Sequence, residues 1–260
     1  MPGIKIWDGS QWRDVKYIYY RELLSWKPAR AAYYWDGSKW VKFWETLEVI
    51  WHCDRYGGAE RIFELSIDDF SAIRSAASPY NSPTGIGGTR DTIWHCDILD
   101  DKIYKLSTSF SVINSADSPG IQPTGIGGDD NTIWHCDMDA CKVYELSKTN
   151  FSVIRSANSP SASPTGIGGD ANVIWHCDSG AKKLYELSKS DFSVIRSADS
   201  PGGLLFNAPW GIGGDYNTIW HSDVDAKEVY ELSVVDFSTI KHTDPPAGAI
   251  SGDPTGIGGK

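Results

Sequence analysis

A unit of about 40 residues occurs five times in this chain of 260 residues, and this repetition constrains the fold more than any other feature of the sequence. One half of the unit is the phrase IWHCD, which reads IWHSD in its last copy and begins at Ile50, Ile93, Ile133, Ile174 and Ile219. The other half is GIGG, which begins at Gly85, Gly125, Gly166, Gly211 and Gly256. The chain is therefore an array of similar units, and each residue belongs to a set of equivalents.

Each unit contains four short segments whose composition is typical of β-strands. In the third copy these are GIGG at 125–128, TIWHCD at 132–137, KVYELS at 142–147 and FSVIRSA at 151–157. β-branched and aromatic residues dominate the last three segments, while Gly, Asp, Asn and Ser occupy the turns between them. Four short strands repeated about every 40 residues indicate the blades of a β-propeller.

The array begins and ends with complementary parts of one unit. Its first copy opens at IWHCD with no GIGG before it, and the chain ends in PTGIGGK at 254–260. We expect these two parts to pair and close a ring, because an open array would need polar capping units. The predicted fold is all-β: a five-bladed β-propeller over residues 47–260, closed by its C-terminal strand, behind a small N-terminal β-hairpin module over residues 1–46.

The array also resembles a known propeller repeat. The phrase PTGIGGDDNTIWHCDMDACKVYEL is similar to the NHL-type repeat, and the likeness extends over residues 48–260. The positions that match its pattern are Pro123, Gly125, Ile126, Asp129, Ile133, Trp134, Asp137, Val143 and Tyr144. The resemblance implies the propeller fold and says little about activity, because propellers host many functions.

Residues 1–45 share none of these motifs and carry a smaller repeat of their own. The phrases IWDGSQW at 6–12 and YWDGSKW at 34–40 each place Asp-Gly between aromatic flanks, a strong signal for a tight hairpin. They resemble the W-D-G-x-x-W-K β repeats at the ends of phage tail, fibre and other virion proteins. That resemblance implies an attachment module; a generic Trp-rich β cap is the alternative. The attachment residues would be Trp7, Trp12, Trp35, Trp40 and Trp44.

Charge separates the two parts of the chain and excludes some partners. The first 45 residues hold eight Lys/Arg and five Asp/Glu, a net charge of +3. Since the whole chain has a net charge of −10, the array carries −13. An acidic array does not favour nucleic acid or an anionic membrane, since both need clustered cations. We find no 18-residue apolar run and no signal-peptide pattern, and expect synthesis in the cytoplasm without membrane insertion. The cysteines at equivalent positions are too far apart for disulfides and are expected to be free thiols.

The repeated histidines and cysteines suggest a metal ring, but strand geometry argues against it. Adjacent residues of a strand point to opposite faces, so the His and Cys of one unit cannot share an ion. We interpret each His as hydrogen-bonded between blades and each Cys and Trp of the phrase as buried. The glycines of GIGG indicate close packing at a narrow axis without reactive side chains. We therefore predict no catalytic residues, no metal, no cofactor and no enzymatic activity.

Two sets of residues are candidates for binding. The first lies in and after an apolar insertion between the fourth and fifth units, where a partner would contact Leu204, Leu205, Phe206 and Trp210. The second consists of Asp-x-Asp pairs expected on one rim, which could hold a cation or a glycan: Asp137 with Asp139, and Asp223 with Asp225. The alternatives are a loop folded over its own blade and Asp residues that form Asx turns.

Taken with the virion resemblance, these features favour a structural protein of a phage particle. In this hypothesis the module docks on the virion, and the propeller faces outward as an adhesin or decoration. Its partners would be other virion proteins or a glycan or protein of a cell surface, and we also consider a homo-oligomeric assembly. Two alternatives are a lectin-like glycan-binding propeller and an intracellular scaffold for protein interactions.

Overall fold

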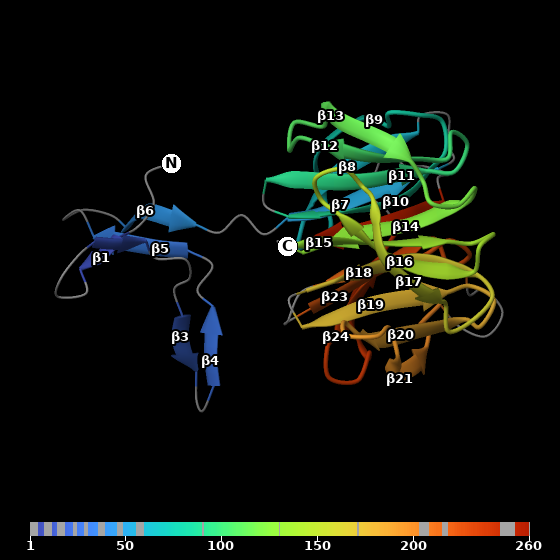
Figure 1. Ribbon diagram of the computed structural model, residues 1–260. Coiled ribbons are helices and arrows are strands. Elements are labelled where there is room, and N and C mark those ends of the chain that lie inside the picture. Colours follow the sequence, from blue (N-terminus) through green and yellow to red (C-terminus); the bar gives the residue numbers. More distant parts are fainter. Residues whose placement is uncertain are drawn as a thin grey trace. The chain divides into compact units, whose positions relative to one another are not determined.

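The computed structural model describes residues 49–259 except 56–59, 90, 130, 171, 203–207, 215–217 and 245–252, and the backbones of six strands within residues 1–48. The chain divides into two compact units, Met1–Glu48 and Val49–Lys260. The described residues of the second unit form five antiparallel sheets of four strands each, arranged as a ring (Figure 1). This is the predicted five-bladed β-propeller.

The blades are numbered by the order of their outer strands. Blade 1 is the sheet β26-β7-β8-β9, and blades 2 to 5 are β10–β13, β14–β17, β18–β21 and β22–β25. The innermost strands carry the GIGG phrase and surround the axis. They are β10 (Pro83–Thr89), β14 (Pro123–Gly128), β18 (Pro164–Gly169), β22 (Pro209–Gly214) and β26 (Pro254–Gly259).

The second strands carry the IWHCD phrase and are the most buried in the ring. They are β7 (Val49–Asp54), β11 (Thr92–Asp97), β15 (Thr132–Asp137), β19 (Val173–Asp178) and β23 (Thr218–Asp223). In each, the five residues from Ile to Asp are buried, because neighbouring blades cover both faces of the sheet. This explains why buried residues follow one another in the phrase and do not alternate with exposed ones.

The two outer strands of each blade become progressively more exposed. The third strands are β8 (Arg61–Ser66), β12 (Lys102–Leu106), β16 (Lys142–Ser147), β20 (Lys183–Ser188) and β24 (Glu228–Ser233). The fourth are β9 (Ala72–Ala77), β13 (Val112–Asp117), β17 (Val153–Asn158), β21 (Val194–Asp199) and β25 (Thr239–Thr243). Each fourth strand leaves one backbone edge of its sheet unpaired by the other strands of that sheet.

The ring closes as the sequence predicts. Strand β26 pairs antiparallel with β7, so that Ile257 faces His52 and Gly258 faces Trp51. The His52 Nδ1–H group donates to the Gly256 carbonyl across the same pair at 2.7 Å. The last strand of the chain thus supplies the innermost strand of blade 1.

The hydrophobic core is divided into clusters that lie between neighbouring blades. Between blades 2 and 3, Trp94 and Ile103 pack against Ile133, Tyr144 and Phe151. The same arrangement recurs around the ring. Tryptophan meets the phenylalanine of the next blade edge to face, with ring centres 5.7 to 6.1 Å apart at the four seams from blade 1 to blade 5. The ring is therefore stabilised mainly by contacts between adjacent blades.

The described residues of the first unit form three antiparallel hairpins. They pair β1 (Lys5–Trp7) with β2 (Trp12–Asp14), β3 (Tyr19–Glu22) with β4 (Ser25–Pro28), and β5 (Ala31–Trp35) with β6 (Trp40–Glu45). The first and third hairpins enclose the two W-D-G phrases, with Trp7 opposite Trp12 and Trp35 opposite Trp40. In the part of the chain that is described, no helix has the length and apolar character needed to cross a membrane.

Candidate functional sites on the ring

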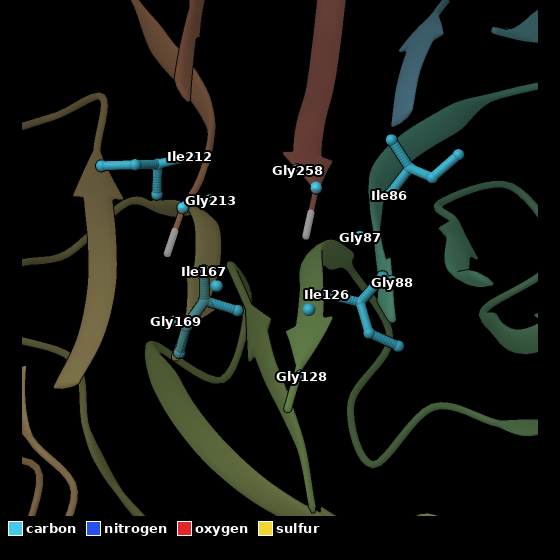
Figure 2. A pocket seen from close by; sticks show the side chains of 14 residues that line it. Ile86, Gly87, Gly88, Ile126, Gly128, Ile167, Gly169, Ile212, Gly213 and Gly258 are labelled. Atoms are coloured by element: carbon cyan, nitrogen blue, oxygen red, sulfur yellow. The ribbon is translucent and has the colours of Figure 1, made fainter. Parts of the chain in front are cut away.

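The axis of the propeller is formed by backbone that approaches closely. A Cβ atom on Gly87 would lie 2.9 Å from the Cα of Gly127 and 2.9 Å from the Ile126 carbonyl oxygen. Figure 2 shows one end of the axis, where a small open depression is lined by isoleucine and glycine. The residues that line it carry no titratable side chain. As the sequence predicts, glycine is needed there for close approach of neighbouring strands.

At the other end, the axis is lined partly by threonines. The Thr124 hydroxyl donates to the Pro164 carbonyl of the next blade at 2.8 Å, so this side chain joins two inner strands. Trp210 occupies the equivalent position in blade 5 and lines this end of the axis together with Thr84, Thr124 and Thr165. Trp210 is half-buried. The predicted contact at this residue stays a prediction.

The repeated histidines form two kinds of hydrogen bond. Four of them bond to a carbonyl of the innermost strand of their own blade: His52, His135, His176 and His221. Four bond to a serine of the preceding blade: His95, His135, His176 and His221. The His135 Nδ1–H group donates to the Gly125 carbonyl at 2.8 Å, and the Ser118 hydroxyl donates to His135 Nε2 at 3.0 Å. A carbonyl can only accept, so the Nδ1 atom of this imidazole carries a proton. Desolvation by burial lowers the pKa of His135 to about 4. The predicted hydrogen bond between blades is confirmed for His95, His135, His176 and His221. It is wrong for His52, whose partners Gly256 and Asp54 both belong to blade 1.

The cysteines of the phrase are fully buried free thiols. The Sγ atom of Cys136 lies 3.6 Å from the Thr124 hydroxyl oxygen, and burial raises the pKa of this thiol well above its usual value. Cys53 and Cys96 show the same direction for the same cause. Because the thiolate is the reactive form, these cysteines are poor nucleophiles at neutral pH.

The aspartates of the predicted rim divide into buried and exposed members. Asp137 is buried, and its two carboxylate oxygens accept the Ala140 and Gln122 backbone N–H groups, both at 2.8 Å. It therefore joins the turn after its own strand to the link that enters its blade. Asp139 is exposed.

Asp223 is also buried and accepts the Ala208 and Ala226 N–H groups, whereas Asp225 is exposed. Burial raises the pKa of Asp223. Within the described residues, no group of three or more His, Cys, Asp or Glu side chains is placed to hold a metal ion. Binding of a cation or glycan by these pairs stays a prediction.

Several other predicted contact residues have side chains outside the described part of the structure. Leu204, Leu205 and Phe206 lie outside the described residues. For the attachment residues only the strand backbones are described: Trp7, Trp12, Trp35, Trp40 and Trp44. Both hypotheses stay predictions.

Sequence reasoning missed one surface feature of the outer strands. In blade 3, Glu145 faces Arg155 and Leu146 faces Val153, so Ile154 is the extra residue of a β-bulge. The same register shift occurs in all five blades. The bulged residue is isoleucine each time, with 54 to 57% of its surface exposed: Ile73, Ile113, Ile154, Ile195 and Ile240. Alignment of the five units would have revealed the retained isoleucine, but not its exposure.

The residue after the bulge is held against the next blade. The Arg155 guanidinium pairs with Glu145 at 2.5 Å, stacks 4.5 Å from the Phe192 ring centre, and donates to the Lys189 and Ser190 carbonyls. These contacts fix the backbone on the C-terminal side of Ile154. The exposed isoleucine is therefore presented from an ordered strand.

Comparison with known proteins extends the fold assignment. No family model matches the chain, and no curated protein matches it. Glutaminyl cyclase from Myxococcus xanthus has a TM-score of 0.55 at 10% identity, over 66% of this chain and 81% of that one. A structure of the nidogen/laminin complex has a TM-score of 0.53 at 12% identity, over 82% of this chain and 98% of that one. A streptogramin B lyase gives 0.48 at 16% identity over 72% of this chain; the chain spans 62% of that protein.

The likeness shows the β-propeller fold. The coarse part of the predicted resemblance, the β-propeller fold, is therefore confirmed. None of these three structures is described as a virion protein, so they lend no support to the predicted phage origin. The fold itself is consistent with a binding or interaction role.

The prediction that the chain is not an enzyme is wrong. Its argument was that a closed ring with a glycine-lined axis leaves no place for reaction chemistry, yet the same fold occurs in the glutaminyl cyclase. The physical reason is that a propeller also offers its rims and loops, which the packing of the axis does not constrain. The likeness assigns no reaction to this chain.

Proposed function

We propose that this chain is a binding protein whose propeller engages a macromolecular partner through the bulged isoleucines of its outer strands. The observation that carries the proposal is their repetition, with more than half of each side chain exposed. The residue before the bulge varies among Ala72, Val112, Val153, Val194 and Thr239. Packing within the blade does not explain why the most exposed of these positions keeps the same apolar side chain in every copy.

The geometry of the ring favours a multivalent mode of binding. Burial of apolar surface contributes about 25 cal/mol per Å², so one isoleucine supplies only a weak contact. Several equivalent contacts on one rigid ring raise the overall affinity, because each later contact forms within the same complex. The net charge of −13 over the array favours a partner whose apolar contact points are edged by Lys or Arg.

The test is recovery of binding partners by the tagged full-length chain from the cells that encode it. Replacement of Ile113, Ile154 and Ile195 by Thr is expected to lower recovery of the proteins bound to the wild-type chain by about tenfold or more. The matched control replaces the preceding residues Val112, Val153 and Val194 by Thr, the residue that blade 5 has there. Equal recovery by both variants would contradict the proposal, provided that both unfold at the wild-type temperature.

The role of the N-terminal unit is a separate part of the proposal. We propose that its Trp-containing hairpins attach the chain to a particle, a virion if the chain is phage-derived, with the propeller as adhesin or decoration. Support comes from the W-D-G-x-x-W phrases and from the register that places Trp7 opposite Trp12 and Trp35 opposite Trp40.

Sedimentation of particles from the encoding cells on a density gradient tests this attachment. The full-length chain is expected in the particle fraction, and replacement of Trp12 and Trp40 by Ala is expected to move it to the soluble fraction. A wild-type chain found only in the soluble fraction would exclude attachment and leave the isoleucine proposal standing.

A further inference from the structure

The seams between neighbouring blades carry charged residues at equivalent positions, and one seam differs from the others in their sign. A seam is named here by the numbers of the two blades that meet there. Seam 3/4 holds two ion pairs: Arg155 lies 2.5 Å from Glu145, and Lys189 lies 2.5 Å from Asp129. Each cation of this seam therefore has a carboxylate beside it.

The first of these ion pairs recurs at three other seams. Its acid lies on the third strand of a blade and faces its cation on the fourth strand: Glu64 with Arg74 at seam 1/2, Glu186 with Arg196 at seam 4/5, and Glu231 with Lys241 at seam 5/1. At seam 2/3 the facing residues are Lys105 and Asn114. A cation therefore stands in the position of the acid, and a neutral amide in the position of the cation.

The second ion pair of seam 3/4 cannot form at seam 2/3. Lys148 is the equivalent of Lys189, because its Nζ group donates to the Asp129 carbonyl at 3.0 Å as Lys189 donates to the Asp170 carbonyl at 3.2 Å. Asp129, the acid that Lys189 pairs with, directly follows the GIGG phrase of blade 3. The residue that follows this phrase in blade 2 is Thr89, which has no carboxylate.

The two lysines of seam 2/3 converge on one tryptophan. Trp94 faces Lys105 in the pairing of β11 with β12, so both side chains lie on the face of blade 2 that packs against blade 3. The Nζ atoms of Lys105 and Lys148 lie 5.5 and 5.7 Å from the centre of the Trp94 ring. Both lysines are half-buried. Such lysines place their stems on apolar surface and keep the ammonium group in water.

Seam 2/3 is therefore positive in a ring that is otherwise acidic. Lys105 and Lys148 contribute two positive charges, and the positions that hold Glu145 and Asp129 at seam 3/4 supply no negative charge here. The turn that begins at Thr89 continues with Arg90 and Asp91 and adds no net charge. Two ammonium groups beside one ring repel each other, and an anion between them would offset this repulsion.

We propose that seam 2/3 binds a phosphate-type oxyanion between Lys105 and Lys148. A phosphate group carries nearly two negative charges at neutral pH and matches both ammonium groups, whereas a carboxylate offsets only one. Its oxygens accept charge-assisted hydrogen bonds from the two Nζ groups, and Asn114, which faces Lys105, adds an amide donor. The site does not depend on the bulged isoleucines of the proposed function.

Acylation of lysines by an N-hydroxysuccinimide ester of acetic acid tests the site in the native chain. The full-length protein is treated in sodium phosphate and, separately, in sodium chloride of equal ionic strength, and the modified lysines are followed by peptide mass spectrometry. Charge-assisted hydrogen bonds from two lysines suggest a Kd of about 1 mM. Phosphate at about 10 mM then leaves about one tenth of the sites free, so acylation of Lys105 and Lys148 should slow about tenfold.

Two other lysines serve as internal controls. Lys102 lies on the same strand as Lys105 and pairs with Asp117, while Lys189 pairs with Asp129 at seam 3/4. Both are expected to react at the same rate in phosphate and in chloride. Unchanged rates at Lys105 and Lys148, or an equal slowing at Lys102 and Lys189, would overturn the proposal.

Calorimetric titration of variants with inorganic phosphate gives the second arm. Lys105→Gln should weaken binding about tenfold, because it removes one charge-assisted hydrogen bond. The matched control Lys102→Gln removes the same charge from the same strand and should leave the Kd unchanged. Equal weakening by both variants would show a general effect of charge and contradict a site at seam 2/3.

A rebuilt ion pair gives the strongest test. The double variant Lys105→Glu with Asn114→Arg has the acid and the cation that occur at the other four seams, so we expect it to fold and to lose phosphate binding. A folded double variant that binds phosphate as the wild type does would overturn the proposal. Acylation of the wild-type chain decides the proposal should this variant fail to fold.

Titration with glycerol phosphate distinguishes two sources of the ligand. Binding as tight as that of inorganic phosphate would identify a phosphate ester of a larger ligand as a possible occupant. Binding of inorganic phosphate alone would identify the free ion. Binding of neither compound would overturn the proposal.

Discussion

At the scale of single residues, the ring is built on polar side chains that the fold has withdrawn from water. The imidazoles of His135, His176 and His221 each bond to a backbone carbonyl on one side and to a serine hydroxyl on the other. The same burial that makes these hydrogen bonds strong makes protonation costly. Acid should therefore destabilise this fold through its histidines.

The pKa values give the direction and the pH range of this effect. Burial lowers the pKa to about 4, from 6.5, for His95, His135, His176 and His221. Between these values the unfolded chain binds protons that the folded chain does not, so the free energy of unfolding falls as pH decreases from 6.5 to 4. Each histidine contributes a slope of about 1.4 kcal/mol per pH unit in that range.

Urea unfolding at several pH values measures this slope. The variant His135→Gln keeps a donor and an acceptor at the site without a titratable group, so its slope should be smaller than that of the wild type by about 1.4 kcal/mol per pH unit. Aspartates with raised pKa, such as Asp97 and Asp223, make the free energy of unfolding rise as pH decreases. They are present in both proteins, so their contribution cancels when the two slopes are compared. Identical slopes would show that this imidazole is not buried as neutral.

At the scale of elements, the turn before each outer strand carries a strained residue. Phe151 has φ of 60°, a left-handed conformation that a bulky side chain adopts at a cost, and its ring packs edge to face on Trp94 of the preceding blade. The same conformation occurs at Phe70, Phe110, Phe192 and Phe237. Packing of the ring between blades offsets the strain of the turn.

This balance predicts an unusual order of stability for substitutions at Phe151. Loss of the ring in Phe151→Ala should cost about 3 to 5 kcal/mol in the free energy of unfolding. Phe151→Gly loses the same packing but relieves the backbone, so it should be about 1 kcal/mol more stable than the alanine variant. At ordinary strand positions a glycine variant is less stable than an alanine variant. Chemical denaturation of the two Phe151 variants measures which is more stable here. An alanine variant more stable than the glycine variant would contradict backbone strain at this residue.

The sequence predicts the strands and the closure of the ring well, because five copies of one pattern reinforce each other. It also predicts why Gly127 cannot carry a side chain, since crowding at an axis follows from the fold. It does not predict that Ile154 is exposed, because apolar and β-branched residues usually indicate a buried strand and the bulge depends on pairing with the neighbouring strand. The hydrogen bonds of Asp137 likewise depend on a turn and an entering link that the folded blade brings beside its carboxylate.

At the scale of the whole molecule, the propeller depends on pairing between its two ends. Removal of residues 254–260 takes away β26, leaves β7 without its inner neighbour and opens the axis on one side. We expect this truncated chain to lose cooperative unfolding and to expose Cys53 to labelling as fast as Cys141. Near-ultraviolet circular dichroism and thiol labelling provide the measurements; a truncated chain with a sharp, wild-type transition would contradict the dependence on closure.

The position of β26 also sets the order in which a ribosome can deliver a finished ring. Among the propeller strands, β7 to β9 emerge first, but the residues that complete their sheet, 254–259, are translated after every other blade. Domains generally fold as units while the chain is being synthesised. The inner edge of β7 therefore stays unpaired until the whole array has been translated. We expect a chaperone that binds the nascent chain to protect this edge.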